Sequence, residues 1–256
     1  MTSAARRARS KPPLAAAPTA GSAGFARVPA IDVLRGLAIV AMILYHFAFD
    51  LAYFRVTASD FYHDPFWLHA RTLILSSFLL LAGVSLALAQ RSENGRTRFW
   101  RHVATIAACA VAVSVASYLV FPRSYIWFGV LHVIALSLIL IRPLAAHPRI
   151  ALVTGIAIIV VGNLAASPWF DQRAWGWLGF MTAKPITEDY VPLFPWTGVM
   201  LVGIALGHAL VRNQFRAVAP FGRGPRLLAW LGRRSLAVYM LHQPILIGVL
   251  YLAVRR

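Results

Sequence analysis

The sequence predicts an all-α protein, a polytopic helical membrane bundle with about seven transmembrane helices. Hydrophobic residues make up 59% of the 256 residues and charged residues only 13%, whereas a soluble domain carries about 25% charged residues. Several apolar runs also approach the ~20 residues that a helix needs to cross hydrocarbon. We place the predicted spans at about 31–53, 72–90, 103–121, 125–141, 150–166, 191–211 and 235–253.

The chain divides into a short tail and one membrane domain. Residues 1–26 are rich in Ala, Pro, Arg and Ser and lack the apolar stretch of a signal peptide. This composition predicts a disordered cytoplasmic tail. Residues 27–256 hold all of the predicted spans, and no long soluble segment remains outside them.

The basic residues predict the orientation of the bundle. A net charge of +17 could indicate nucleic-acid binding, but the arginines lie in connections between apolar runs and not on a soluble face. With the N-terminus inside, 17 of the 25 basic residues fall in the tail and the cytoplasmic connections. The positive-inside rule therefore favours a cytoplasmic N-terminus, an outer C-terminus and a multi-pass membrane protein without a nucleic-acid partner.

The first predicted span carries four ionisable side chains within an otherwise apolar run. Asp32, Arg35, His46 and Asp50 fall within roughly 60° of one another around a helix of 100° per residue. Charged groups in a membrane are costly and generally face a bundle interior or a water-filled cavity. The stripe therefore predicts a buried reaction or transport path.

His46 and Asp50 are the strongest catalytic candidates. His46 lies roughly 22 Å along the helix from Ile31, towards the outer leaflet. A carboxylate four residues later can orient the imidazole and support its protonated form, as a general base requires. The alternative is a structural hydrogen bond to a neighbouring helix. His63 lies beside Asp64 in an outer connection, where a histidine is as often simply solvated.

Two predicted outer connections are longer and richer in aromatic and polar residues than the inner ones. They cover residues 55–71 and 167–190, and the second contains Trp169, Trp175 and Trp177 beside several carboxylates. Tryptophan at this level is most often a membrane-interface anchor. Rings beside carboxylates also suit a sugar-binding mouth, and both interpretations stay open.

Several other functional classes lack their sequence patterns. The chain has no H-E-x-x-H sequence and no close cluster of Cys and His, so we predict no metal site. A P-loop, a dinucleotide-binding glycine fingerprint and a G-x-S-x-G elbow are also missing from the sequence.

Five segments together resemble the heparan-alpha-glucosaminide N-acetyltransferase catalytic-domain family. The run IDVLRGLAIVAMILYHFAFDL is similar to the family's first helix. The likeness continues, in the expected order, in FLLLAGVSLAL, FGVLHVIALSLIL, PLFPWTGVMLVGIALG and LGRRSLAVYMLHQPI. It covers residues 27–250 and looks most like the short bacterial members. The spacing Arg35-x10-His46 also resembles a motif of the related membrane O-acyltransferases that modify surface polysaccharides.

The resemblance assigns roles to only some residues. His46 and Arg35 match the Arg-x10-His pattern, whereas the lysosomal enzymes have asparagine at the position of His46. Their catalytic histidine lies in the next loop before a tryptophan, and His63, four residues before Trp67, is its nearest match. His132 and Val133 replace the glutamine and arginine of the family's G-V-L-Q-R stretch.

The resemblance implies an acyltransferase of the bacterial inner membrane, with acetyl-CoA as co-substrate. CoA phosphates would dock at the arginine-rich inner face, near Arg35, Arg233 and Arg234, and His46 with Asp50 would deprotonate a sugar amine or hydroxyl. His63 would position the acceptor or share the base role. The implied partners are membrane lipid and a sugar or lipid-linked glycan, and homo-oligomerisation is left open.

Two other function classes remain open from the residues alone. A proton- or solute-coupled transporter would also place His, Asp and Arg in a membrane path, although it would favour broken helices and repeats. A haem-binding electron carrier is a third reading, because His46, His132 and His242 lie in separate predicted helices and paired histidines can ligate haem.

Overall fold

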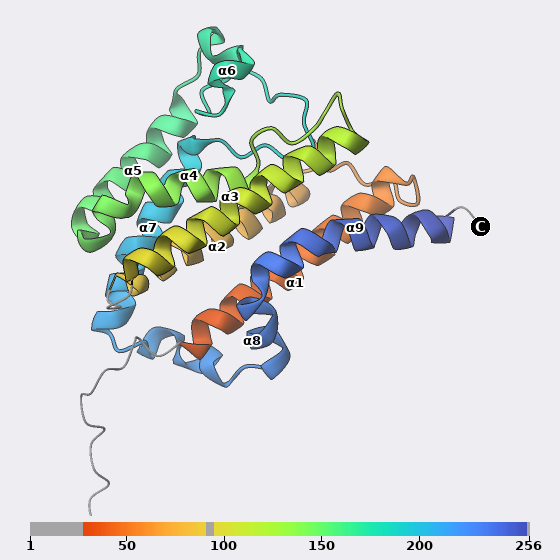
Figure 1. The fold of residues 1–256 in the computed structure, drawn as a ribbon. Helices are drawn as coiled ribbons and strands as arrows, with labels where there is room; N and C mark the ends of the chain where they lie inside the picture. The colour runs from red at the N-terminus through yellow and green to blue at the C-terminus, as the bar shows by residue number, and fades with distance from the viewer. Residues whose placement is uncertain (1–27, 91–94, 255–256) are drawn as a thin grey trace, which may run out of the picture.

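The computed structural model describes residues 28–90 and 95–254, and within these ranges the chain is helical without a named β-strand. The predicted tail at 1–26 lies outside the described residues. Figure 1 shows the helices as one elongated bundle with two groups of helices.

Each predicted span falls on one helix of the bundle. The helices that correspond to the spans are α1 (Pro29–Tyr53), α2 (Pro65–Ala89), α3 (Gly95–Val120), α4 (Val130–Ile141), α5 (Pro148–Leu164), α7 (Leu193–Arg212) and α9 (Ser235–Val254). The connections add α6 (Arg173–Gly176), α8 (Arg226–Arg233) and the 3-10 segments η1 (Arg142–Ala146), η2 (Pro168–Asp171) and η3 (Arg216–Arg223).

Five helices are long and apolar enough to cross a membrane, namely α1, α2, α3, α7 and α9. The fourth and fifth predicted spans form shorter apolar helices, with α4 and η1 together covering Val130–Ala146 and α5 covering Pro148–Leu164. These findings confirm the all-α membrane bundle that the composition predicts.

Helix α2 begins seven residues before the predicted span at 72–90. The side chain of Asp64 accepts a hydrogen bond from the backbone N–H of Phe66, and Pro65 occupies the first helical turn. Asp is a favoured N-cap and Pro a favoured first residue. The helix therefore starts at a capping signal, and it extends beyond the apolar run that the prediction followed.

The bundle is built around two helices. Helix α7 packs against α2, α4 and α5, and these helices share the main hydrophobic core. Helix α1 packs against α8, α9, η3 and α2. In Figure 1, α1 and α9 lie side by side with α8 next to them, and α2 separates this group from α7.

Glycines allow the closest helix crossings. A Cβ atom on Gly83 of α2 would lie 1.9 Å from the carbonyl oxygen of Met200 in α7, and one on Gly232 of α8 would lie 1.8 Å from that of Asp32 in α1. Small residues that let helix backbones approach are typical of membrane-helix interfaces. The contact at Gly232 fixes α8 against the first turn of α1.

The two ends of the bundle differ in character. One end, called the basic end below, holds the start of α1, η1, η3 and α8, and the last two carry Arg216, Arg223, Arg226 and Arg233. The opposite end, called the loop end, holds the connections 54–64 and 165–192. These connections meet where the Lys184 ammonium lies 5.7 Å from the ring centroid of Tyr62.

Candidate active site

Helices α1 and α9 share a buried polar contact within the apolar bundle. Asp50 of α1 is 2% exposed, and its Oδ1 accepts a hydrogen bond of 2.8 Å from Nε2 of Gln243 in α9. The sequence predicted that Asp50 orients His46, but its hydrogen-bond partner is Gln243. Among the described residues His46 Nδ1 faces the carbonyl oxygen of Met42 and not Asp50, and the orienting role of Asp50 stays a prediction.

The backbone determines which nitrogen of His46 is available for chemistry. Its Nδ1 lies 2.9 Å from the carbonyl oxygen of Met42, one helical turn earlier. A carbonyl oxygen can only accept a hydrogen bond, so Nδ1 carries the proton in a neutral ring and Nε2 keeps its lone pair. Nε2 makes no hydrogen bond to another described residue. The half-buried imidazole is thus held in the form that a general base requires.

His242 of α9 repeats this arrangement against His46. Its Nδ1 lies 2.6 Å from the carbonyl oxygen of Tyr239, which again leaves the lone pair on Nε2. The rings of His46 and His242 meet edge to face, with centroids 4.8 Å apart and planes inclined by 68°. His242 is only 8% exposed. The structure therefore adds a second histidine to the site that the sequence placed on α1 alone.

Three buried polar atoms in this cluster have no hydrogen-bond partner among the described residues. They are Asp50 Oδ2, His242 Nε2 and Gln243 Oε1. An unsatisfied buried polar group costs about 1–3 kcal/mol, and polar groups buried in proteins are generally hydrogen-bonded. We call the four side chains of His46, Asp50, His242 and Gln243 the α1–α9 cluster.

Arg35 lies nearer the basic end, about 16 Å from His46 along α1 at the usual helical rise. Its Nη2 donates a 2.7 Å hydrogen bond to Ser85 Oγ of α2, and its Nη1 lies 3.5 Å from Asp32 Oδ1. These contacts hold the guanidinium between α1 and α2.

A hollow of about 210 Å³ opens at the basic end beside α2. Arg96 and Arg142 contribute positive charge, and the Arg142 guanidinium lies 4.2 Å from the ring centroid of Phe99. An apolar wall with guanidinium groups at its edge suits a ligand that combines a ring with phosphates. The sequence analysis did not identify this hollow.

Arg233 and Arg234 lie at the end of α8 and are exposed. The Arg234 guanidinium is 5.3 Å from the ring centroid of Trp230. Because Gly232 contacts the backbone of Asp32, these two arginines lie at the same end of the bundle as Arg35.

His63 lies at the loop end, away from the α1–α9 cluster. Its side chain is 86% exposed, and Nδ1 lies 2.8 Å from Asp60 Oδ2. Hydrogen bonds from the backbone of Tyr62 and then from His63 lower the pKa of Asp60. The neighbouring Phe61 is buried against Tyr45 and Trp67. The connection is therefore anchored by aromatic rings, while His63 faces outward and makes no contact with His46.

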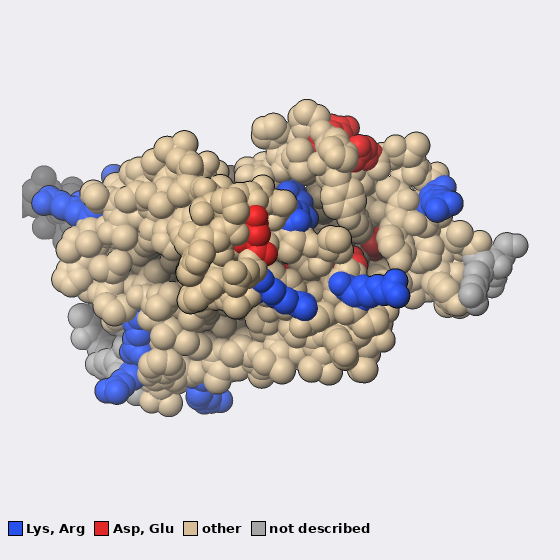
Figure 2. Space-filling view, turned by 90° about the horizontal axis from the view of Figure 1, so that it is seen from above, with Lys and Arg blue, Asp and Glu red and all other residues tan. Residues whose placement is uncertain are grey.

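Charged groups from the connection 165–192 and from α2 gather at the loop end, where sequence spacing did not predict them. Asp189 Oδ2 accepts a 2.8 Å hydrogen bond from the backbone N–H of Val130 at the start of α4. Burial raises the pKa of Asp189, and the positive charges of Lys184 and Arg71 oppose this rise. Figure 2 shows acidic and basic side chains close together near the middle of one face of the molecule.

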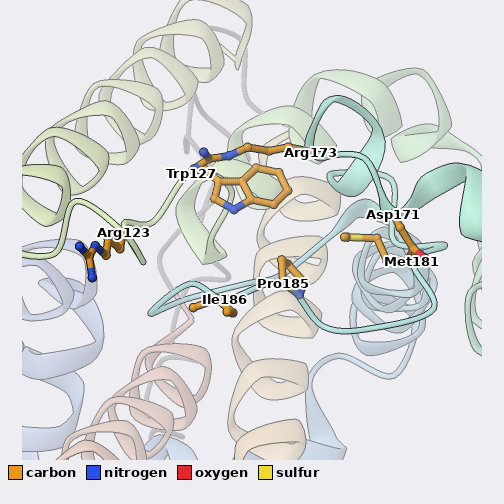
Figure 3. A pocket seen from close by; sticks show the side chains of 7 residues that line it. All are labelled: Arg123, Trp127, Asp171, Arg173, Met181, Pro185 and Ile186. Atoms are coloured by element: carbon orange, nitrogen blue, oxygen red, sulfur yellow. The ribbon is translucent and has the colours of Figure 1, made fainter.

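A second, shallow hollow of about 200 Å³ lies under the connection 165–192 (Figure 3). Arg173 points over its aromatic wall, with the guanidinium 4.5 Å from the ring centroid of Tyr125 and 5.7 Å from that of Trp127. Asp171 is held by Thr182, through hydrogen bonds from its hydroxyl and its backbone N–H, and these bonds lower the pKa of Asp171. The mixture of rings, guanidinium and carboxylate is typical of a surface that contacts polar ligands.

Among the described residues, no group of three or more His, Cys, Asp or Glu side chains is arranged to hold a metal ion. The α1–α9 cluster instead presents nitrogen and oxygen lone pairs beside a histidine pair. Such a group can accept protons and hydrogen bonds, which is the chemistry of a general base and of its substrate-binding neighbours.

The comparisons with known proteins place this arrangement in a family. No curated protein and no solved structure matches the chain. A family model described as heparan-alpha-glucosaminide N-acetyltransferase, catalytic, matches residues 27–244, which include the whole α1–α9 cluster. This is an acetyltransferase family of membrane proteins, and it favours an enzyme over the transporter and the electron carrier. The protein thus belongs to the heparan-alpha-glucosaminide N-acetyltransferase catalytic-domain family and is an enzyme with acyltransferase activity.

Proposed function

We propose that this acyltransferase moves an acetyl group from cytosolic acetyl-CoA to an amine or hydroxyl of a sugar on the outer side of a bacterial inner membrane. The observation that carries the proposal is His46, whose Nε2 lone pair is kept free by the hydrogen bond between Nδ1 and Met42. The family uses acetyl-CoA as donor in general, and the acceptor is a sugar or a lipid-linked glycan.

The basic end supports binding of the donor. Coenzyme A carries several phosphate charges, and guanidinium groups bind phosphates by charge-assisted, often bidentate hydrogen bonds. Arg96 and Arg142 line the hollow at this end, while Arg35 is held between α1 and α2. Arg233 and Arg234 extend the same positive surface. The positive-inside rule puts this end in the cytosol, where acetyl-CoA is made available.

The reaction at His46 follows from its tautomer. The acceptor N–H or O–H gives its proton to His46 Nε2, and the lone pair of the acceptor forms a bond to the thioester carbonyl carbon. The C–S bond then breaks, and the sulfur of coenzyme A leaves with the proton that the imidazole returns. General-base assistance of this kind contributes about 10²–10⁴-fold to rate. A relay in which His46 Nε2 is itself acetylated would start from the same lone pair.

Asp50 and His63 have supporting roles in this proposal. The buried carboxylate of Asp50 stabilises positive charge on the adjacent histidines during proton transfer. His63 is exposed at the loop end, where an acceptor from the outer side would arrive, and it positions that acceptor before transfer.

Purified protein with labelled acetyl-CoA and sugar acceptors tests the proposal. His46→Ala is expected to lose at least a hundredfold in transfer rate while it keeps its fold and its affinity for CoA. The matched control is His69→Ala, which alters an exposed histidine whose Nδ1 lies 2.6 Å from the carbonyl oxygen of Pro65, one turn earlier. Transfer by His46→Ala at the wild-type rate would refute the base role. Solute uptake into liposomes that does not depend on CoA would favour a transporter.

A further inference from the structure

The three unpaired atoms of the α1–α9 cluster are all acceptors in the observed arrangement. Gln243 donates its Nε2 to Asp50 Oδ1, so the amide presents its oxygen on the other side. His242 donates through Nδ1 to Tyr239, so its unpaired Nε2 holds a lone pair. Asp50 Oδ2 is the third acceptor. A site in which the unpaired buried atoms are all acceptors is complementary to a ligand that brings several N–H or O–H groups.

The donors are not supplied by the protein within the described residues. The amide of Gln243 is the side-chain donor that reaches this carboxylate, and its hydrogen bond goes to Asp50 Oδ1 and leaves Oδ2 unpaired. The Nδ1 protons of His46 and His242 are both held by backbone carbonyl oxygens of their own helices. A different hydrogen bond therefore fixes the tautomer of His46, the tautomer of His242 and the orientation of the Gln243 amide. In each of the three side chains the remaining lone pair lies on the side opposite to that hydrogen bond.

We propose that α9 supplies the acceptor-binding residues of the active site. Gln243 Oε1, His242 Nε2 and Asp50 Oδ2 receive hydrogen bonds from the amino and hydroxyl groups of the acyl acceptor, and the edge-to-face contact of the two imidazoles directs the reacting group to His46 Nε2. Gln243 and His242 thereby set affinity for the acceptor and not for the acyl donor. This inference rests on the proposed function, in which His46 is the base.

The packing of α9 is consistent with entry of a ligand. His242 and Leu250 are the buried residues of this 20-residue helix, and Pro244 removes one of its backbone hydrogen bonds immediately after Gln243. Among the long apolar helices described, α9 has the smallest share of buried side chains and α1 one of the largest. Most of the surface of α9 is therefore open to a lipid or a ligand, and His242 is one of its few side chains that face the bundle.

The test compares the Michaelis constants of the two substrates in Gln243→Leu and His242→Phe. Glucosamine is the acceptor probe, because it offers an amine beside hydroxyls, and labelled acetyl-CoA is the donor. Each variant is expected to raise KM for glucosamine at least tenfold and to change KM for acetyl-CoA less than twofold. Leu241→Ala is the control, since Leu241 is an exposed apolar neighbour on the same helix. An unchanged KM for glucosamine, or an equal rise in both constants, overturns the inference.

A binding measurement separates this inference from the proposed function and covers a variant that folds poorly. Glucosamine and CoA are expected each to raise the thermal midpoint of the wild type, and Gln243→Leu and His242→Phe, which each remove one acceptor, should lose only the glucosamine effect. If the wild type transfers no label but shows this selective loss, the proposed reaction fails and the binding site stands. If neither glucosamine nor glucose stabilises the wild type, or if both variants still respond to glucosamine, the inference is overturned.

Discussion

The hydrogen bond between Asp50 and Gln243 should contribute measurably to the stability of the bundle. Gln243→Leu leaves Asp50 with two unpaired oxygens, because in the described part of the chain Oδ2 already has no partner and Gln243 alone satisfies Oδ1. A hydrogen bond to a charged group is worth about 1.5–3 kcal/mol, whereas polar contacts between membrane helices average about 0.6 and reach about 1.7 kcal/mol. With Asp50 2% exposed, we expect the upper end of the membrane range, about 1.5 kcal/mol.

A double-mutant cycle isolates this contribution. Asp50→Leu alone should also destabilise, by about 1–3 kcal/mol, because it leaves both ends of the Gln243 amide buried without a partner. The double variant Asp50→Leu/Gln243→Leu removes both polar groups and is expected to recover most of the loss. The interaction energy between the two sites should then be about 1–2 kcal/mol.

Equilibrium unfolding in mixed detergent micelles, followed by the fluorescence of the eight tryptophans, measures the four free energies. Leu241→Ala, at an exposed position of α9, reports the cost of an ordinary apolar truncation on the same helix. A double variant that lost the sum of the two single effects would show that Asp50 and Gln243 do not stabilise each other. A loss in Gln243→Leu no larger than that in Leu241→Ala would show the same.

Three further predictions concern helix packing, donor binding and pH. Gly83→Ala should destabilise by about 1–3 kcal/mol through overpacking against Met200, while Gly248→Ala, where a Cβ meets open space, should be neutral or stabilising in the same unfolding assay. Arg35→Ala should weaken CoA binding about ten- to hundredfold in a labelled-CoA binding assay, the equivalent of one charge-assisted hydrogen bond, and Arg173→Ala at the loop end should not. Because burial raises the pKa of Asp189 above its ordinary 3.8, the folded chain keeps this proton to higher pH than the unfolded chain. Its contribution to stability should therefore fall as pH rises through the interval above 3.8, and Asp189→Asn, which keeps an acceptor for Val130, should flatten that fall in unfolding curves measured across this range.

The transmembrane architecture could be predicted because hydrophobicity reports it directly. Each apolar run corresponds to a helix, since backbone groups in a membrane must be paired within the segment that crosses it. Helix ends were less predictable, because the limits of an apolar run mark where the chain leaves the hydrocarbon, whereas a helix continues to the residue at which its backbone is capped. Helix α2 starts at the Asp64 cap and extends through charged residues such as Arg71, and α3 starts at Gly95, eight residues before the predicted span.

Sequence spacing identified half of the α1–α9 cluster. It found His46 and Asp50 because both lie within one amphipathic stripe of a single helix, where positions four residues apart are neighbours. It could not find their partners, since Gln243 is separated from Asp50 by 193 residues. From the sequence His242 is a candidate only as a haem ligand, and only the fold shows that it packs on His46. One signal was present, namely the adjacent polar pair His242–Gln243 within an apolar helix.

The double variant Asp50→Leu/Gln243→Leu also separates a structural pair from a binding site. If the two polar groups serve only to join α1 to α9, replacing both should leave the fold stable and acetyl transfer unchanged, provided that His46 keeps its hydrogen bond to Met42. If they bind the acceptor, the same protein should be folded, should bind CoA with wild-type affinity and should require at least tenfold more glucosamine for half-maximal rate. Natural proteins retain buried, unsatisfied polar groups at functional sites at a cost in stability. A double variant that is at least as stable as the wild type and deficient only towards the acceptor would show that the two polar groups serve binding and not stability. Unimpaired transfer would show that the pair is a structural link.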